Sequence, residues 1–261
     1  MIIGSVCENK ATEKRISVTP DNVKKFVSNG FKVYLEKNYG DHLDIDDEKF
    51  LENGAEFFSD KEKIIKESDI LLQLNLPDEK DLKNLAPNKN LVGVFDPINN
   101  KESISKLSKN NVNVFSLELL PRITRAQSMD ILSSQANLAG YKAVIDAFSF
   151  FNKAIPMMMT AAGTVPAAKV LVVGAGVAGL QAIATAKRMG AIVFATDVRM
   201  ASKEQVESLG GKFLVVEGSE NLETSGGYAK EASVEFKTKQ ENLLKETLKK
   251  IDIVICTALI P

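Results

Sequence analysis

The chain has 261 residues, of which 44% are hydrophobic and 26% are charged, a balance typical of a soluble globular protein. Its 33 basic residues nearly match its 34 acidic ones, so it has no net positive field for a nucleic-acid backbone or an anionic membrane. Two cysteines without a C-x-x-C pair or a histidine cluster disfavour a disulfide framework and a metal site. No run of about eighteen apolar residues occurs, so we expect no direct membrane insertion and no nucleic-acid partner.

The first half of the chain alternates β-branched apolar runs with amphipathic segments. The apolar runs predict strands at residues 2–6, 31–35, 70–74, 91–95 and 112–117. The amphipathic segments predict helices, several with an aspartate near the start as a cap, at residues 21–29, 60–67, 78–85 and 101–109. Because strand, helix and strand follow one another, we expect a doubly wound parallel sheet, and we place this α/β domain at residues 1–126.

A long helix is predicted next, at residues 127–152, where apolar residues repeat at intervals of three and four. Thr124 lies three residues ahead of Gln127, which predicts a capping box at the start of this helix. The following segment, MMMTAAGTVPAAK, has an Ala-Gly turn between two short runs and predicts a hairpin arm.

A second alternation completes the predicted second domain, residues 127–261. Strands are expected at residues 169–173, 192–196, 213–216 and 251–256, and helices at 177–189, 202–209 and 238–250. Residues 217–234 are poor in apolar side chains and predict a mobile surface loop. The last strand has no covering helix after it, so we expect the fold to be truncated at its C-terminal end. The fold class is therefore α/β, with two Rossmann-like domains joined by a long helix.

A glycine-rich segment, VVGAGVAGL, follows the first strand of this second domain. Gly174 would permit a tight turn, Gly176 would let the backbone approach a pyrophosphate, and Gly179 would let helix pack on strand. Asp197, at the end of the next strand, would accept hydrogen bonds from ribose hydroxyls and repel a 2′-phosphate. These residues predict an NAD(H) site in preference to an NADP(H) site, whereas Arg199 is the one feature nearby that would suit a 2′-phosphate.

The polar segment RITRAQSMD, residues 122–130, lies between the two predicted domains. On a helix that begins near Arg125, one face would carry Gln127, Asp130, Ser133, Ser134 and Asn137. Arg122 would lie in the loop ahead of it and could pair with Asp130. The residues alone fit a solvated, capped helix start as well as they fit a binding site, and the position between two domains favours the site.

These motifs together resemble the NAD(H)-binding component, domain I, of proton-translocating nicotinamide nucleotide transhydrogenase. The resemblance covers essentially the whole chain and is carried by RITRAQSMDILSSQANLAGYKAV, VVGAGVAGLQAIATAKRMGAIVFATD, SGGYAKE and DIVICTALIP. In that family a further C-terminal segment returns to the first domain, which agrees with the uncovered last strand.

The resemblance implies roles for individual residues. The nicotinamide end of NAD(H) would be surrounded by Arg122, Gln127, Asp130 and Ser133. The pyrophosphate and adenosine ribose would be held by Gly174, Gly176, Val177, Gly179 and Asp197. Arg122 would fix the carboxamide with help from Asp130, Gln127 would lie toward a partner domain, and Tyr228 would lie on a loop that closes over the nucleotide.

The resemblance also implies an oxidoreductase activity, direct hydride transfer from NADH to NADP⁺ held on a partner domain. A membrane component would couple the transfer to proton translocation. The reaction needs no acid or base at the carbon, so the protein would contribute orientation of the two rings, on the order of several kcal/mol. The hairpin would pack across a homodimer. The expected location is cytoplasmic and peripheral to the inner membrane, or the mitochondrial matrix in a eukaryote.

Alanine dehydrogenase is the main alternative, because the chain resembles it at GSVCENKATEKRISVTP, including Arg15, and in the glycine motif. That enzyme uses a lysine and a histidine in acid–base chemistry. The corresponding positions hold Gln73 and Asp96, neither of which does that work at neutral pH, and His42, the only histidine, is expected in a solvated turn. A non-catalytic NAD-binding fragment is the third alternative.

Overall fold

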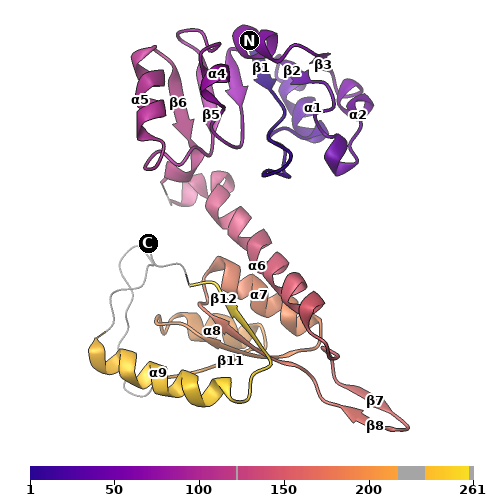
Figure 1. Ribbon diagram of the computed structural model, residues 1–261, viewed down its shortest axis with the longest axis vertical. Coiled ribbons are helices and arrows are strands. Elements are labelled where there is room, and N and C mark those ends of the chain that lie inside the picture. The colour runs from indigo at the N-terminus through magenta and orange to yellow at the C-terminus, as the bar shows by residue number, and fades with distance from the viewer. Residues whose placement is uncertain (122, 217–232, 259–261) are drawn as a thin grey trace. The chain divides into compact units, whose positions relative to one another are not determined.

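The computed structural model describes residues 1–121, 123–216 and 233–258. The chain divides into two compact units, Met1–Ile131 and Leu132–Pro261 (Figure 1). Both contain a parallel sheet flanked by helices, which confirms the predicted α/β class. The predicted domain boundary after residue 126 stays a prediction.

The first unit contains a six-stranded sheet in the order β3-β2-β1-β4-β5-β6. All of its neighbouring strands are parallel. The order places the topological switch point between β1 and β4, as in doubly wound folds. The strands are β1 Ile2–Ser5, β2 Lys32–Glu36, β3 Ala55–Phe58, β4 Ile70–Leu72, β5 Asn90–Gly93 and β6 Asn113–Ser116.

Five α-helices and two short 3₁₀ helices connect these strands in the described part of the first unit: α1 Pro20–Ser28, η1 Asp41–Leu43, α2 Asp47–Leu51, α3 Lys61–Glu67, α4 Glu79–Leu82, α5 Lys101–Lys109 and η2 Leu117–Leu119. Asp60 caps α3 as predicted, because its carboxylate accepts hydrogen bonds from the amides of Glu62 and Lys63. At α1 the cap is Thr19, which forms a capping box with Asn22. The sequence pattern missed α2 and β3, since both are short and the segment that contains them is highly charged.

The side chains of the first sheet alternate between two hydrophobic clusters. Val33 and Leu35 of β2 pack in one cluster with Val23 of α1 and Phe50 of α2. Tyr34, between them in the sequence, packs in the other cluster, which also contains Ile64 and Ile65 of α3 and Leu107 of α5. Helices therefore cover both faces of the sheet, as the doubly wound prediction requires.

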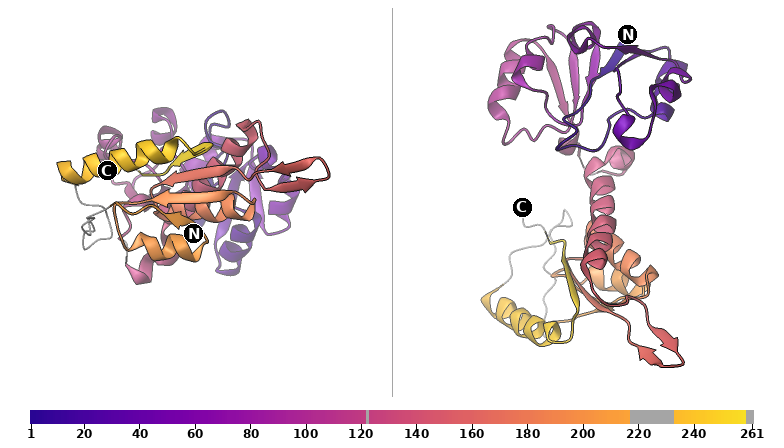
Figure 2. Two further views of the ribbon diagram at one scale, coloured as in Figure 1. Left: turned by 90° about the horizontal axis from the view of Figure 1, so that it is seen from below. Right: turned by 45° about the vertical axis from the view of Figure 1, so that its right-hand side comes forward.

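The second unit contains a four-stranded parallel sheet in the order β11-β10-β9-β12. Figure 2 shows helices α8 and α9 on opposite faces of this sheet. Its described elements are α6 Ile131–Phe150, β7 Met158–Thr160, β8 Gly163–Val165, β9 Lys169–Val173, α7 Val177–Arg188, β10 Ile192–Thr196, α8 Ser202–Ser208, β11 Lys212–Phe213, α9 Val234–Leu248 and β12 Ile253–Cys256. Residues 217–232, most of the predicted mobile loop, lie outside the described residues.

The predicted start of the long helix is wrong by four residues. A separate 3₁₀ helix, η3 Thr124–Met129, precedes α6, and its N-cap is Ile123, which has no side-chain oxygen to offer. Asp130 follows with ψ of 89°, outside helical values, so the backbone leaves the helical path before Ile131. Thr124 therefore does not cap α6, and Gln127 and Asp130 do not share a helix face with Ser133.

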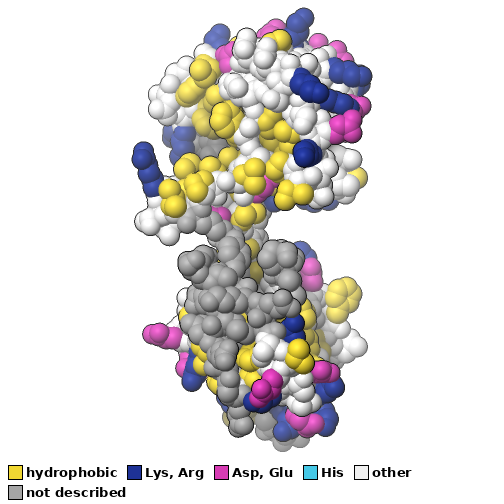
Figure 3. All heavy atoms as spheres, turned by 90° about the vertical axis from the view of Figure 1, so that its left-hand side faces the viewer, with side chains coloured by type: hydrophobic (Ala, Val, Ile, Leu, Met, Phe, Trp, Pro, Cys, Tyr) yellow, Lys and Arg dark blue, Asp and Glu magenta, His cyan; other side chains and the backbone are white. Residues whose placement is uncertain are grey.

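The predicted hairpin is confirmed: β7 and β8 pair antiparallel, and all six of their residues are exposed. Figure 2 shows it extending from the rest of the second unit. Met159 is 77% exposed, which is unusual for a large apolar side chain in a monomer's surface arm. Figure 3 shows further hydrophobic side chains among polar ones on one face of the first unit. Within the described residues, no helix combines the length and hydropathy needed to cross a membrane.

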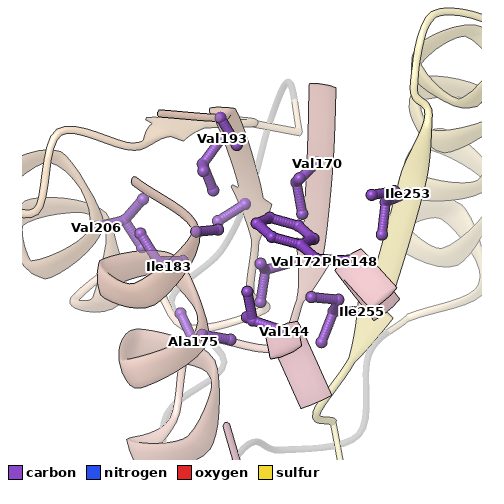
Figure 4. Close-up of a cluster of buried hydrophobic side chains, with 14 residues drawn as sticks. Val144, Phe148, Val170, Val172, Ala175, Ile183, Val193, Val206, Ile253 and Ile255 are labelled. Atoms are coloured by element: carbon purple, nitrogen blue, oxygen red, sulfur yellow. The ribbon is translucent and has the colours of Figure 1, made fainter. Parts of the chain in front are cut away.

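Helix α6 contributes to the core of the second unit. Val144 and Phe148 are buried among strand residues, including Val170 and Ile255, and Figure 4 shows them between the sheet and α7. Gly140 lies where α6 passes closest to α7, because a Cβ added there would stand 2.0 Å from the carbonyl oxygen of Ala178. The two helices therefore meet through backbone atoms at this point.

Replacement of Gly140 by alanine tests this close approach. We expect Gly140→Ala to lower the free energy of unfolding by about 1–3 kcal/mol, because the steric overlap outweighs a helix-propensity gain of roughly 1 kcal/mol. The measurement is urea unfolding followed by circular dichroism. Asn137→Ala, at an exposed position of the same helix, is the matched control and should leave stability unchanged or slightly higher. Equal stability of Gly140→Ala and the unsubstituted chain would contradict the packing described.

Candidate functional site

The turn from β9 into α7 is built from three glycines with different local requirements. Gly174 has φ of +95°, a conformation that side chains rarely adopt, and a Cβ on it would stand 2.8 Å from the amide nitrogen of Ala258. A Cβ on Gly179 would stand 1.9 Å from the carbonyl oxygen of Gly174. At Gly176, by contrast, Arg199 Nη2 at 3.9 Å is the only heavy atom of the described residues within 4 Å. Two glycines therefore serve the fold, and the third leaves open space.

The N-terminus of α7 opens onto that space. Its N-cap residue is Gly176, which has no side chain to accept a hydrogen bond from the first amides of the helix. Free amides and the helix dipole make such an end favourable for an anion. Val177, the first residue of α7, is 42% exposed, so the entrance to the helix end is not filled by a core side chain.

Asp197 lies beside the glycine turn, directly after β10. Its side chain is only 6% exposed, and its Oδ2 accepts a hydrogen bond of 2.7 Å from the amide of Ala175. Burial alone would raise its pKa, but the hydrogen bonds from Arg199 and Ala175 outweigh burial and hold the pKa below its usual value. The carboxylate is therefore ionised at neutral pH, and it lies beside the glycine turn, as the sequence predicts.

Two residues that the motif did not single out also belong to this site. Thr257 follows β12, and its hydroxyl donates to the carbonyl oxygens of Gly174, at 2.9 Å, and Val173, at 3.3 Å. Arg199 forms an ion pair with Asp197, with Nη2 to Oδ2 at 2.9 Å. The signal for Thr257 was its position after a parallel strand next to β9, because residues at the carboxyl ends of adjacent strands converge.

The segment RITRAQSMD is distributed over the two units. Gln127 is exposed on η3, next to the buried Ala126, and Asp130 is half-buried at the end of η3; both belong to the first unit. Ser133 is half-buried on α6, in the second unit. Arg122 and Tyr228 lie outside the described residues. The structure thus brings together the glycines and Asp197, whereas the expected nicotinamide residues stay predictions.

In the first unit, the residues that correspond to an amino-acid dehydrogenase site are engaged in internal contacts. Arg15 donates from Nε and Nη2 to the two carboxylate oxygens of Glu13, at 2.9 and 2.7 Å. Gln73 is 4% exposed, accepts from the amide of Val6 and donates to Glu8. These side chains hold the end of the sheet together.

The other two positions fit this interpretation. Asp96 has φ of 44°, and its carboxylate accepts hydrogen bonds from the backbone amide and the side chain of Asn99. His42 is half-buried rather than fully solvated, with Nε2 at 3.0 Å from the carbonyl oxygen of Lys14. Among the described residues, no group of three or more His, Cys, Asp or Glu side chains is placed to hold a metal ion.

Comparison with known proteins matches both halves of the chain to one family. Residues 4–139 match the family described as alanine dehydrogenase/PNT, N-terminal domain, and residues 143–261 match alanine dehydrogenase/PNT, C-terminal domain. An NAD(P) transhydrogenase subunit alpha protein of Rhodospirillum rubrum is 49% identical over 261 residues, which span 97% of this chain and 68% of that protein.

Two solved structures show the same fold over the whole chain. A transhydrogenase from Sinorhizobium meliloti superposes with a TM-score of 0.90 at 46% identity, with 100% of this chain and 70% of that chain covered. An L-alanine dehydrogenase superposes with a TM-score of 0.77, with 100% of this chain and 67% of that chain covered. At 20% identity, this second likeness shows the fold alone.

The Glu13–Arg15 pair predicts a pH-dependent part of the stability. Hydrogen bonds from Arg15 lower the pKa of Glu13 from 4.5 to about 2, against the opposing effect of burial. Because the folded-state pKa is depressed, the stabilisation is present above the unfolded value of 4.5 and is lost as pH falls toward about 2. Glu13→Gln should therefore lower the free energy of urea unfolding at neutral pH and progressively less in acid.

A matched control is Glu102→Gln, which removes a carboxylate that pairs with Lys106 but is 85% exposed. We expect a smaller loss at neutral pH, because exposed ion pairs contribute little. A difference between Glu13→Gln and the unsubstituted chain that stayed constant down to the lowest pH would refute the linkage.

Proposed function

The chain belongs to the alanine dehydrogenase/PNT family as a homologue of the transhydrogenase alpha subunit, and on that premise we propose that it binds NAD(H) and exchanges hydride with NADP(H) on a partner. The observation that carries the proposal is the open glycine turn beside a buried, ionised Asp197, in a chain that resembles those alpha subunits throughout. These parts fit a dinucleotide with a free ribose diol.

Each element of the proposed nucleotide site has a physical role. The pyrophosphate would lie against Gly176 and Val177, where the amides at the N-terminus of α7 stabilise negative charge. Gly174 and Gly179 shape the turn so that nothing from the backbone blocks that approach. Asp197 would accept hydrogen bonds from the adenosine ribose and repel a 2′-phosphate.

The nicotinamide end would be held by the polar segment that links the two units along the chain. We assign Arg122, Gln127 and Asp130 to the orientation of the ring, with Ser133 beside them, on the strength of the family resemblance. Hydride would pass directly from the dihydronicotinamide carbon of NADH to the nicotinamide carbon of NADP⁺. No proton is gained or lost at carbon, so orientation of the two rings, rather than an acid or a base, would be the contribution of these residues.

The proposed activity requires partners. A second protein domain would carry NADP(H), and a membrane component would translocate protons, so the chain would be held at the inner membrane through other subunits. Tyr228 would lie on a segment that closes over NAD(H). The exposed apolar side chains of the β7–β8 arm, Met158, Met159 and Val165, would be covered in a homodimer.

Alanine dehydrogenation is a weaker candidate. Arg15 is retained, but its guanidinium is held by Glu13, and Gln73 is committed to Val6 and Glu8. A substrate carboxylate would have to break the Arg15–Glu13 pair, and no lysine or histidine stands at the two positions that perform acid–base chemistry. Alanine-dependent reduction of NAD⁺ is accordingly not expected.

Hydride transfer tests the proposed function directly. The chain, mixed with a transhydrogenase NADP(H)-binding domain, should transfer hydride between NADH and NADP⁺, followed by absorbance with a nicotinamide analogue as acceptor. Arg122→Ala should slow the transfer far more than it weakens NADH binding, because orientation acts on the rate. NADH binding without transfer would support a non-catalytic module, and alanine-dependent NAD⁺ reduction would support the dehydrogenase.

The glycine turn gives a second test. Gly176→Ala should raise the dissociation constant for NADH by roughly tenfold, about 1.4 kcal/mol, because its methyl group enters the space left for the pyrophosphate. Stability should be unchanged, since Gly176 has φ of −77° and only Arg199 Nη2 lies near. Gly179→Ala is the contrasting variant and should destabilise the fold. Calorimetric titration and thermal unfolding of both variants separate the two effects, and normal NADH binding by Gly176→Ala would count against the pyrophosphate position.

A further inference from the structure

The carboxylate of Asp197 is fully used by neighbours in the second unit. Its Oδ1 accepts from the amide and from Nε of Arg199, both at 2.9 Å. Its Oδ2 accepts from the amide of Ala175 at 2.7 Å and from Nη2 of Arg199 at 2.9 Å. A carboxylate offers about four lone-pair positions. These four bonds therefore occupy the acceptor positions that ribose hydroxyls would need.

Only one of these donors can leave without a change in the backbone. The amide of Ala175 is fixed by the glycine turn, and the amide of Arg199 is fixed by the chain after β10. The guanidinium of Arg199 is a side-chain group, 22% exposed against 6% for the side chain of Asp197, so it has a path to solvent. Its Nη2 also stands 3.9 Å from the position of a Cβ on Gly176, at the edge of the space expected to receive the pyrophosphate.

We propose that the guanidinium of Arg199 is an internal competitor of the nucleotide: it must leave Asp197 before the ribose diol can bind. The proposal rests on the proposed function, because it takes Asp197 as the ribose acceptor. Arg199 is thus a specificity-determining residue. A ribose with two hydroxyls replaces the two side-chain hydrogen bonds of the guanidinium with two of its own, whereas a 2′-phosphate offers Asp197 no proton.

The competition also explains why an arginine two residues after Asp197 need not mark an NADP(H) site. While both oxygens of Asp197 pair with the guanidinium, the charge of Arg199 is already balanced. A planar fork on a carboxylate is the strongest form of such a pair. A 2′-phosphate would have to separate this pair and then remain beside the exposed charge of Asp197.

The test is the affinity of Arg199→Met for NADH, measured by calorimetric titration at neutral pH. Methionine keeps the length of the side chain but has no donor. If the guanidinium is off Asp197 in about one molecule in ten, its removal should tighten NADH binding by about tenfold. Binding of NADPH should not gain in this way. A residue with a merely structural role would weaken binding when replaced, so the direction of the change distinguishes the two roles.

Two further variants complete the experiment. Arg199→Lys should bind NADH with intermediate affinity, because a single ammonium lacks the planar fork that covers both oxygens, and it serves if the methionine variant does not fold. Arg188→Met, which removes an exposed arginine from the last turn of α7, is the matched control and should bind as the unsubstituted chain does.

Stability provides an independent readout. Without nucleotide, Arg199→Met should unfold at a lower temperature than the unsubstituted chain, because a buried carboxylate loses partners. Saturation with NADH should remove most of this difference. Unchanged or weaker NADH binding by both Arg199 variants would overturn the competition while leaving the proposed function intact. Failure of the unsubstituted chain to bind NADH would overturn both.

Discussion

The turn from β9 into α7 is held by contacts between backbone atoms, and the rest of the candidate site takes its position from it. Gly179 approaches the carbonyl of Gly174 more closely than any side chain would permit, so α7 begins directly over the end of β9. That placement brings the amide of Ala175 to the carboxylate of Asp197, and the hydroxyl of Thr257 to the carbonyl of Gly174. Strands β9, β10 and β12 are thereby joined at their carboxyl ends, where ligands of doubly wound sheets bind.

The two sheets begin with the same strand order, yet their switch points are closed and open respectively. In the first unit, Glu8 accepts from the amides of Leu74 and Asn75, and Ser5 donates to the carbonyl of Leu72. Side chains thus fill the crevice between β1 and β4. In the second unit the corresponding position is a glycine turn, and the space over Gly176 is bounded among described residues only by Arg199. A shared architecture therefore supports a site in one unit and a closed end in the other.

Most of the fold could be predicted from the sequence, because apolar periodicity follows directly from burial. The strands around residues 2–6 and 169–173 are buried in the sheets and were clear in the pattern. The start of α6 was not, since a 3₁₀ turn and an α-helix share their polar spacing over Thr124 to Asp130, and the pattern does not record ψ at Asp130. At the site, the glycine spacing predicted the turn correctly. The Arg199–Asp197 pair was beyond reach, because the direction of a side chain depends on packing that no motif encodes.

Gly140 has a mechanical consequence for the helix that contains it. Side chains between two helices can change rotamer and absorb a small displacement, but Gly140 meets the carbonyl of Ala178 without any side chain between them. Ala178 belongs to the first turn of α7, at the end where an anion would bind. A shift of that turn would therefore be passed to α6 with little loss, as a rigid lever passes the movement of one arm to the other.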